Sequence, residues 1–243
     1  MKKHLYDSIA ERWLKKNGAV WLYSDPHFND PDSKLMRPDY IGDEEQLRRI
    51  NSKVGKNDTI IILGDLGDLS YVKRIRGYKV LVMGNHDAGA SNYKRVTTVT
   101  GPFVHNESHT EPYTELWEKH FREHPEHKNL FDIEDNHLFD EVYEGPLMIN
   151  DRIILSHEPI SPLPPYMFNI HGHTHRPCNA TVPEAFGVAE PHGMNLCAER
   201  TGYMPVSLKR VIESGFLSQT KNIHEYTVDK RLGRDLTDGG QPT

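Results

Sequence analysis

The chain has 243 residues, of which 36% are hydrophobic and 26% charged, and its formal net charge is −6. This length fits a single α/β domain over residues 1–243, and the acidic balance disfavours a protein that coats long nucleic acid. With only two cysteines, no apolar run near the roughly 18 residues of a membrane span and no signal-peptide core, the chain is expected to be cytoplasmic, without a disulfide framework or a membrane partner.

Short apolar runs bounded by polar residues or glycine recur along the chain and predict buried strands. Between the first two runs, Leu47, Ile50 and Val54 recur at helical spacing, which predicts a βαβ unit. Asn150 and Asp151 separate two runs as in a hairpin, so we expect mixed sheets. The predicted strands cover residues 19–24, 59–64, 79–84, 147–149, 152–157 and 168–171.

The remaining segments are more polar. Residues of about 105–140 are rich in Glu, His and Pro, and we interpret them as an insertion over one rim of the core, partly helical around 114–124. A further helix is expected to begin at Pro205 and to end at Gly215. The Gly-rich end at about 234–243 is expected to be frayed.

The sequence His-Phe-Arg-Glu-His at 120–124 matches the H-x-x-E-H pattern of inverted zinc proteases. A charged helix face explains Glu118, His120, Glu123 and His124 more simply. The two interpretations make opposite predictions, because a protease site would be lost with the segment 105–140, whereas a metal site in the core would survive.

Potential metal ligands directly follow five of the predicted strands. In open α/β sheets the loops at the carboxyl ends of strands converge, so these side chains are expected to meet. Gly64 and Gly84 precede Asp65 and Asn85, and the missing side chains let the backbone approach a crowded centre. Histidine combined with carboxylate suits Zn, Mn, Fe or Ni better than Mg or Ca. The side chains concerned are Asp25, His27, Asp65, Asn85, His86, Asp87, His157, His173 and His175.

In their order these residues resemble the calcineurin-like metallophosphoesterases. The family motifs D-x-H, G-D, G-N-H-[DE], [GS]-H and G-H-x-H are matched in turn within residues 24–175. The segment NLCAERTGYMPVSL, residues 195–208, looks like the closing segment of a small bacterial and phage branch of that family. The resemblance implies a four-layer α/β/β/α sandwich of two mixed sheets flanked by helices.

The resemblance also implies a reaction, hydrolysis of a phosphomono- or phosphodiester by a hydroxide that bridges two metals. His86 would stabilise charge or protonate the leaving oxygen, and Asp87 would fix its tautomer. Two divalent transition-metal ions would be required, with Mn preferred and Fe, Zn or Ni as alternatives. The implied ligands are Asp25, His27 and His175 on one ion, Asn85, His157 and His173 on the other, and Asp65 between them.

Some neighbouring residues keep open roles. His171 would support the site or contact the substrate, and Cys178 could join the site as a soft ligand. Asp68 matches the family pattern G-D-x-x-D-R-G, but the phosphate-binding arginine after it is absent, which disfavours a phosphoprotein substrate.

A small, nucleotide-like phosphoester is therefore the expected substrate. The rival interpretation is a catalytically silent scaffold protein that keeps the fold. Degenerate members of the superfamily typically lack a ligand or the histidine of G-N-H, whereas this chain keeps all seven ligands and His86. The choice between monoester and diester, the physiological metal and the oligomeric state are left open by the sequence.

Overall fold

Strands and helices alternate along the first part of the chain, as the apolar runs predict. The computed structural model describes residues 13, 18–37, 39–87, 95–102, 104, 110–150, 152–175 and 192–213. The helices are α2 (Pro31–Met36), α3 (Asp43–Lys53), α4 (Leu69–Arg74), α5 (Glu115–Glu123) and α6 (Leu208–Glu213), with 3-10 helices η1 (Asn85–Asp87), η2 (Pro125–Leu130) and η4 (Ala198–Thr201). The strands are β1 (Val20–Tyr23), β2 (Thr59–Ile62), β3 (Tyr78–Val82), β4 (Arg95–Thr100), β5 (Thr110–Pro112), β6 (Asp132–His137), β7 (Glu141–Tyr143), β8 (Leu147–Met148), β9 (Ile153–Leu155), β10 (Phe168–His171), β11 (Gly193–Asn195) and β12 (Val206–Ser207).

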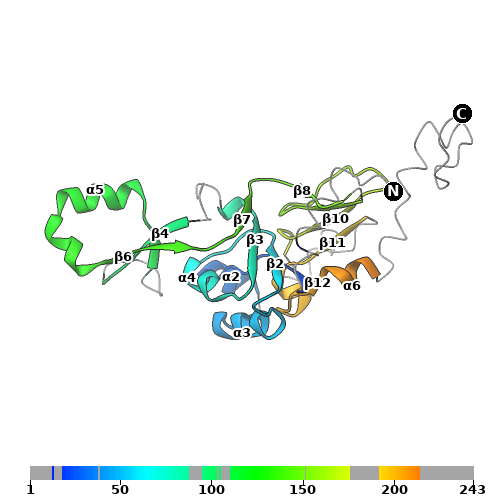
Figure 1. Ribbon diagram of the computed structural model, residues 1–243, viewed down its shortest axis with the longest axis horizontal. Coiled ribbons are helices and arrows are strands. Elements are labelled where there is room, and N and C mark those ends of the chain that lie inside the picture. Colours follow the sequence, from blue (N-terminus) through cyan, green and yellow to red (C-terminus); the bar gives the residue numbers. More distant parts are fainter. Residues whose placement is uncertain are drawn as a thin grey trace, which may run out of the picture.

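The first sheet has the strand order β12-β1-β2-β3-β7 and lies at the centre of the molecule (Figure 1). Strands β1, β2, β3 and β7 run parallel, and β12 pairs antiparallel with β1. Helix α3 connects β1 to β2, so the predicted βαβ unit is confirmed. The parallel arrangement directs the ends of β1, β2 and β3 to one edge of the sheet.

The second sheet has the strand order β11-β10-β9-β8. Strands β9, β10 and β11 are parallel, and β8 is antiparallel to β9 through the predicted hairpin. The side-chain oxygen of Asn150 closes this turn by accepting bonds from the amides of Arg152 (2.8 Å) and Ile153 (2.7 Å). Both sheets are therefore mixed, as expected.

Alternate side chains of the first sheet enter two different cores. Leu22 and Ile61 face the second sheet and share a core with its strands, whereas Tyr23, Ile60 and Ile62 face helices α3 and α4. Burial of each such aliphatic side chain contributes roughly 1.5–3 kcal/mol, and burial on both faces explains the continuous apolar runs. The expected fold of two mixed sheets flanked by helices is confirmed.

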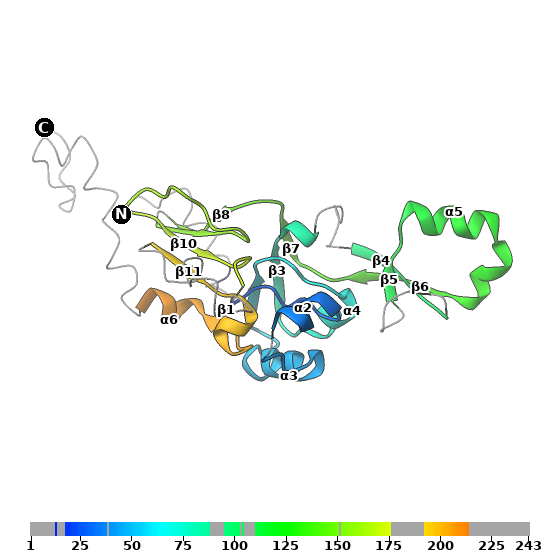
Figure 2. The ribbon, with the colours of Figure 1, turned by 180° about the vertical axis from the view of Figure 1, so that it is seen from behind.

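Residues 95–137 form an arm that projects from one end of the molecule (Figures 1 and 2). The arm contains the antiparallel sheet β5-β4-β6, helix α5 and 3-10 helix η2, around a core cluster of its own. The helix predicted at 114–124 is confirmed as α5. The arm differs in extent from the insertion expected at about 105–140, because β4 already belongs to the arm, while Leu138 and Phe139 pack in the main core.

The helix expected from Pro205 begins later. Val206 and Ser207 pair with β1, so α6 starts at Leu208, and the Ser207 hydroxyl accepts a bond from the Arg210 amide (3.4 Å). Gly215, Cys178 and the tail at 234–243 lie outside the described residues. Within the described ranges, no helix combines the length and the apolar character that crossing a membrane requires.

Candidate metal centre

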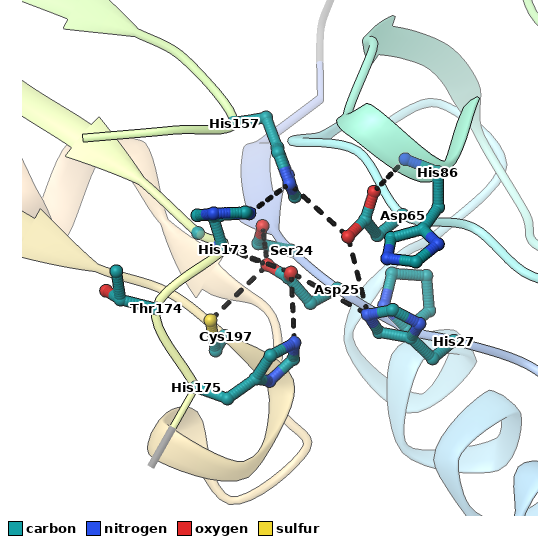
Figure 3. A network of polar contacts seen from close by, with 12 residues as sticks. Ser24, Asp25, His27, Asp65, His86, His157, His173, Thr174, His175 and Cys197 are labelled. Carbon is teal, nitrogen blue, oxygen red and sulfur yellow. Dashed lines mark hydrogen bonds and ion pairs between the residues drawn. The ribbon is translucent and has the colours of Figure 1, made fainter. Parts of the chain in front are cut away.

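Seven side chains converge where strands of the two sheets end (Figure 3 shows six of them). Both sheets contribute, because three groups follow strands of the first sheet and two groups follow strands of the second. We call these side chains the candidate metal centre: Asp25 and His27 after β1, Asp65 after β2, Asn85 after β3, His157 after β9, and His173 and His175 after β10.

Four of these residues have a left-handed backbone that side chains other than glycine rarely adopt. The φ angle is 52° at Asp25, 44° at His27, 54° at Asp65 and 63° at His173. Such conformations cost on the order of 1–3 kcal/mol each, persist only when the surroundings hold them, and cluster at functional sites. Backbone bonds provide this hold, including that from the His27 amide to the Asp65 carbonyl (3.0 Å).

Two glycines allow the loops to pack closely, as expected. A Cβ atom on Gly64 would lie only 2.5 Å from the Cα of Gly84 and 2.6 Å from Nδ1 of His157. A Cβ atom on Gly84 would lie 2.9 Å from the same nitrogen and would press on Asp65. A side chain at either position would therefore push the candidate ligands apart.

The imidazoles of His27 and His157 are oriented by acceptors behind their rings. Nδ1 of His27 lies 2.9 Å from Oδ2 of Asp30, and Nδ1 of His157 lies 2.8 Å from the carbonyl oxygen of Leu63. A proton on each Nδ1 turns the Nε2 lone pair toward the centre, which is the usual arrangement of metal-binding histidines. Burial, assisted by the charge of Arg37, lowers the pKa of His27 and favours this neutral form.

His175 is oriented by a carboxylate that the sequence analysis missed. Its Nδ1 lies 3.1 Å from Oε1 of Glu199, whose other oxygen lies 3.6 Å from Nε of the buried Arg37. Arg37 also donates to the backbone oxygen of Asp25 (2.9 Å). Glu199 lies in the closing segment, so a sequence signal existed, whereas nothing in the sequence around Arg37 indicated its position.

The carboxylate of Asp65 faces both halves of the centre. Its Oδ2 lies 3.5 Å from Nε2 of His27 and 3.3 Å from Nε2 of His157. Burial opposes ionisation of Asp65, but the bond and charge of His157 outweigh it and lower the pKa of Asp65 to about 2. For His157, burial lowers the pKa, but Asp65 and Asp25 outweigh it and raise the pKa to about 9. Without metal, the two side chains therefore form an ion pair.

Three acceptors surround one nitrogen in the half of the centre that contains Asn85. Nε2 of His157 lies 2.9 Å from Oδ1 of Asn85, 3.1 Å from Nδ1 of His173 and 3.3 Å from Oδ2 of Asp65. A single N–H group cannot serve three acceptors well at once. A cation between these atoms would be attracted by all of them, so the donor set fits a divalent metal.

The other half of the centre gathers around Asp25. Its Oδ1 lies 3.4 Å from Nε2 of His175 and 3.9 Å from Nε2 of His27. The thiol of Cys197 donates to Oδ2 of Asp25 (3.4 Å), and burial raises the pKa of this thiol well above its usual value. The soft side chain at the site is therefore Cys197, and the suggested Cys178 is outside the described residues.

The carboxylate of Asp87 binds backbone amides of the centre, and its role in fixing the tautomer of His86 stays a prediction. Its Oδ2 accepts bonds from the amides of Asp65 (2.8 Å) and Gly84 (2.9 Å), and its Oδ1 accepts one from Leu66 (3.2 Å). Burial raises the pKa of Asp87, although the three amides counteract this. Asp87 therefore fastens the loop that carries Asp65 to the loop that carries Asn85.

His86 lies at the exposed rim of the centre. Its amide donates to Oδ1 of Asp65 (3.0 Å), which orients that carboxylate. Its ring is exposed, with a centroid 5.5 Å from that of His27. This position allows the imidazole to meet a ligand that enters from solvent (Figure 3).

The closing segment, residues 195–208, holds the loop that carries His173 and His175. The side-chain amide of Asn195 donates to the carbonyl oxygen of Thr174 (2.6 Å). Arg200 donates to the carbonyl oxygens of Thr174 (3.2 Å) and His175 (3.3 Å). These bonds fix the loop against η4 and against β11 of the second sheet.

Two residues with open roles have structural surroundings. His171 is buried at the end of β10, with Nδ1 2.9 Å from the carbonyl oxygen of Gly172. Asp68 caps helix α4 by accepting a bond from the Ser70 amide (2.8 Å). Both positions favour supporting roles over contact with a ligand.

Comparisons with known proteins agree with this geometry. A family model described as calcineurin-like phosphoesterase matches residues 18–177, a range that contains all seven side chains of the candidate metal centre. The crystal structure of a protein of unknown function from Aquifex aeolicus is similar, with a TM-score of 0.51 and 20% sequence identity. The match covers 82% of this chain and 100% of that one, and it supports the fold alone. No curated protein matches the chain.

Proposed function

Because the chain belongs to the calcineurin-like phosphoesterase family, we propose that it hydrolyses a phosphomono- or phosphodiester with two divalent transition-metal ions. The observation that carries the proposal is the position of Asp65. One carboxylate oxygen lies within 3.5 Å of Nε2 of His27 and within 3.3 Å of Nε2 of His157. A shared carboxylate between two sets of nitrogen and oxygen donors is the arrangement that two-metal hydrolysis requires.

The residues around this carboxylate have different roles in the proposed reaction. Two divalent ions held there would supply Lewis-acid polarisation of the phosphate oxygens and make hydroxide available near neutral pH. The acceptors behind His27, His157 and His175 keep the Nε2 atoms aimed at the centre. The exposed imidazole of His86 stabilises charge on the phosphate or gives a proton to the leaving oxygen.

A small, nucleotide-like ester is the substrate class we propose, with Mn²⁺ as the preferred metal. The net charge of −6 supports a small substrate over a long polynucleotide. The position after Asp68 holds Leu69, which supports a substrate other than a phosphoprotein. The low cysteine content supports a reducing, cytoplasmic location.

Hydrolysis of bis-p-nitrophenyl phosphate and of p-nitrophenyl phosphate tests the proposal. The wild-type protein is expected to turn over at least one of these esters with Mn²⁺ and to lose turnover on chelation. Asp65→Asn removes the shared carboxylate and should abolish turnover. Asp68→Asn is the matched control, because asparagine also caps helices and the residue lies in the same loop.

The two esters also distinguish the alternatives. Faster turnover of the diester or of the monoester identifies the preferred class. Absence of turnover with Mn²⁺, Ni²⁺, Fe²⁺ and Zn²⁺, in a protein shown to contain bound metal, would contradict the proposal and favour the catalytically silent scaffold.

A further inference from the structure

Three histidines and one glutamate gather on the arm, at the junction of α5 and η2. Helix α5 lies at the far end of the arm from the candidate metal centre (Figure 1). His120 lies in the last turn of α5, His124 is the residue that caps its C-terminus, and η2 begins at Pro125. Glu126 and His127 follow in η2, so the fold returns them toward the same helix face.

The side chains of this group converge on one another. Nδ1 of His127 lies 3.2 Å from Nε2 of His120, and Oε1 of Glu126 lies 3.5 Å from Nδ1 of His124 and 3.8 Å from Nε2 of His127. One ligand atom from each of His124, Glu126 and His127 lies within 4.8 Å of the others. The ring centroid of His124 lies 5.2 Å from the ring centroid of His120 and 5.0 Å from that of His127.

A charged helix face, the explanation favoured from the sequence, does not account for this convergence. On such a face each side chain would point separately into solvent, as long charged side chains do. Packing on the arm core explains only His120, whose ring contacts Trp117, Phe121 and Phe131. The rings of His124 and His127 contact the ring of His120 and each other.

We propose that His124, Glu126 and His127 form a second metal site, separate from the candidate metal centre. His120 orients His127, because its Nε2 lies 3.2 Å from Nδ1 of His127, on the side of the ring away from the Nε2 that faces Glu126. Imidazole nitrogens with one carboxylate suit Zn²⁺ and the neighbouring ions Co²⁺, Ni²⁺ and Cu²⁺, whereas Mg²⁺ and Ca²⁺ need more oxygen ligands.

The role of this site is to fasten α5 to η2. Among the described residues of the arm, the core cluster contains Val99, Val104, Phe121 and Phe131, with Tyr113 and Trp117 packed beside them. Cores of this size commonly need a disulfide or a metal to hold them. The inference does not rest on the proposed hydrolysis, because the arm site contains no residue of the candidate metal centre.

Zinc content of the full-length protein tests the inference. Chelator-treated protein is equilibrated with micromolar free Zn²⁺, and bound zinc per chain is measured for the wild type, for His124→Gln combined with His127→Gln, and for His137→Gln. The double variant is expected to bind one ion fewer. His137→Gln is the matched control, because His137 is an exposed histidine of the same arm. Equal zinc content in all three proteins would overturn the inference.

Hydrogen exchange provides a local readout that does not depend on the core ions. Zn²⁺ at ten times the dissociation constant is expected to slow amide exchange in residues 115–130 by about tenfold in the wild type and in His137→Gln. No such protection is expected in the double variant. Exchange in the wild-type arm that Zn²⁺ leaves unchanged would contradict a site that fastens α5 to η2.

Discussion

At the scale of single residues, the carboxylate of Asp87 fastens two loops of the candidate metal centre through three backbone amides. Asp87→Asn replaces one accepting oxygen by an NH₂ group that opposes these donors. We expect the free energy of unfolding to fall by about 2 kcal/mol, the range for bonds to a charged acceptor. Urea denaturation measures the change. Unaltered stability would contradict the fastening role and return Asp87 to the predicted partnership with His86.

Unlike the buried Asp87, His86 has an exposed ring at the rim of the centre, so its substitution should affect catalysis and not stability. His86→Gln keeps the amide that orients Asp65 and removes only the imidazole. We expect kcat to fall by about 10²- to 10⁴-fold, the usual contribution of a general acid, with metal content and stability unchanged. Steady-state kinetics with metal analysis check this. An unchanged kcat would rule out a catalytic imidazole, and lost metal would make His86 part of the metal support.

The His157–Asp65 pair makes the metal-free protein sensitive to pH. Its histidine has a pKa raised from 6.5 to about 9, so the stabilisation is complete below pH 6.5 and is lost as pH rises to 9. Asp65, with its pKa lowered to about 2, stays ionised throughout. The loss amounts to at most about 3 kcal/mol. The unfolding midpoint of chelator-treated protein should therefore fall over this window.

His157→Gln isolates this effect from other titrations. The variant should show a flatter dependence of the midpoint on pH between 6.5 and 9 than the wild type. Parallel curves for the two proteins would show that the ion pair does not stabilise the metal-free state.

At the scale of elements, the arm joins the core through adjacent chain ends. Arg95 and His137 are directly opposite in the β4–β6 ladder, so a short glycine linker can replace residues 95–137. We expect this deletion to leave Mn²⁺ binding in the core intact, because no side chain of the candidate metal centre lies in the arm. If the arm instead contained a zinc-protease site as the place of metal binding, the deletion would abolish all metal binding.

The same deletion tests whether the arm selects substrates. Surface insertions commonly set specificity on a fixed catalytic scaffold, so the relative rates across a nucleotide ester panel should change. Identical relative rates before and after deletion would show that the arm has no part in selectivity.

The core elements were predictable because both faces of their strands are buried. The run at 59–64 contains four consecutive apolar residues and forms β2, and the run at 168–171 is buried throughout as β10, although Asn169 and His171 are polar. Strands β6 and β12 were not predicted, because they form through pairing with neighbouring strands and not through an apolar pattern of their own. Strand β6 has the polar sequence DIEDNH, and Val206 and Ser207 form a strand by pairing with β1. Tertiary contacts override such local patterns.

The seven side chains of the candidate metal centre could be predicted from the sequence. The residues that orient these side chains were harder to predict. The loops at the strand ends bring the seven side chains together, which motif order and strand placement anticipated. Asp30 and Arg37 lie in ordinary polar sequence, so no local pattern marks them. Glu199 lies in the closing segment, but its contact with the distant His175 could not be predicted from that segment alone. The bonds of Asp87 to three backbone amides were not predicted, because proximity to His86 in the sequence does not fix the direction of a side chain.

At the scale of the whole molecule, the centre depends on two sheets at once. The first sheet supplies Asp25, His27, Asp65 and Asn85, and the second supplies His157, His173 and His175. The cores that hold the sheets together therefore also set the distance between the ligand groups. The histidine cluster of the arm shares no residue with this centre, so the two proposed metal sites can be tested independently.

The central claim is that Asp65 joins two metal ions, and electron paramagnetic resonance of the Mn²⁺-loaded protein tests it most directly. The double variant of His124 and His127 is the host, so that the arm binds no ion. The account predicts two Mn²⁺ ions per chain with an exchange-coupled spectrum, which Asp65→Asn converts to uncoupled signals while Asp68→Asn retains the coupling. A single uncoupled ion in the host protein, or coupling that survives in Asp65→Asn, would contradict the claim.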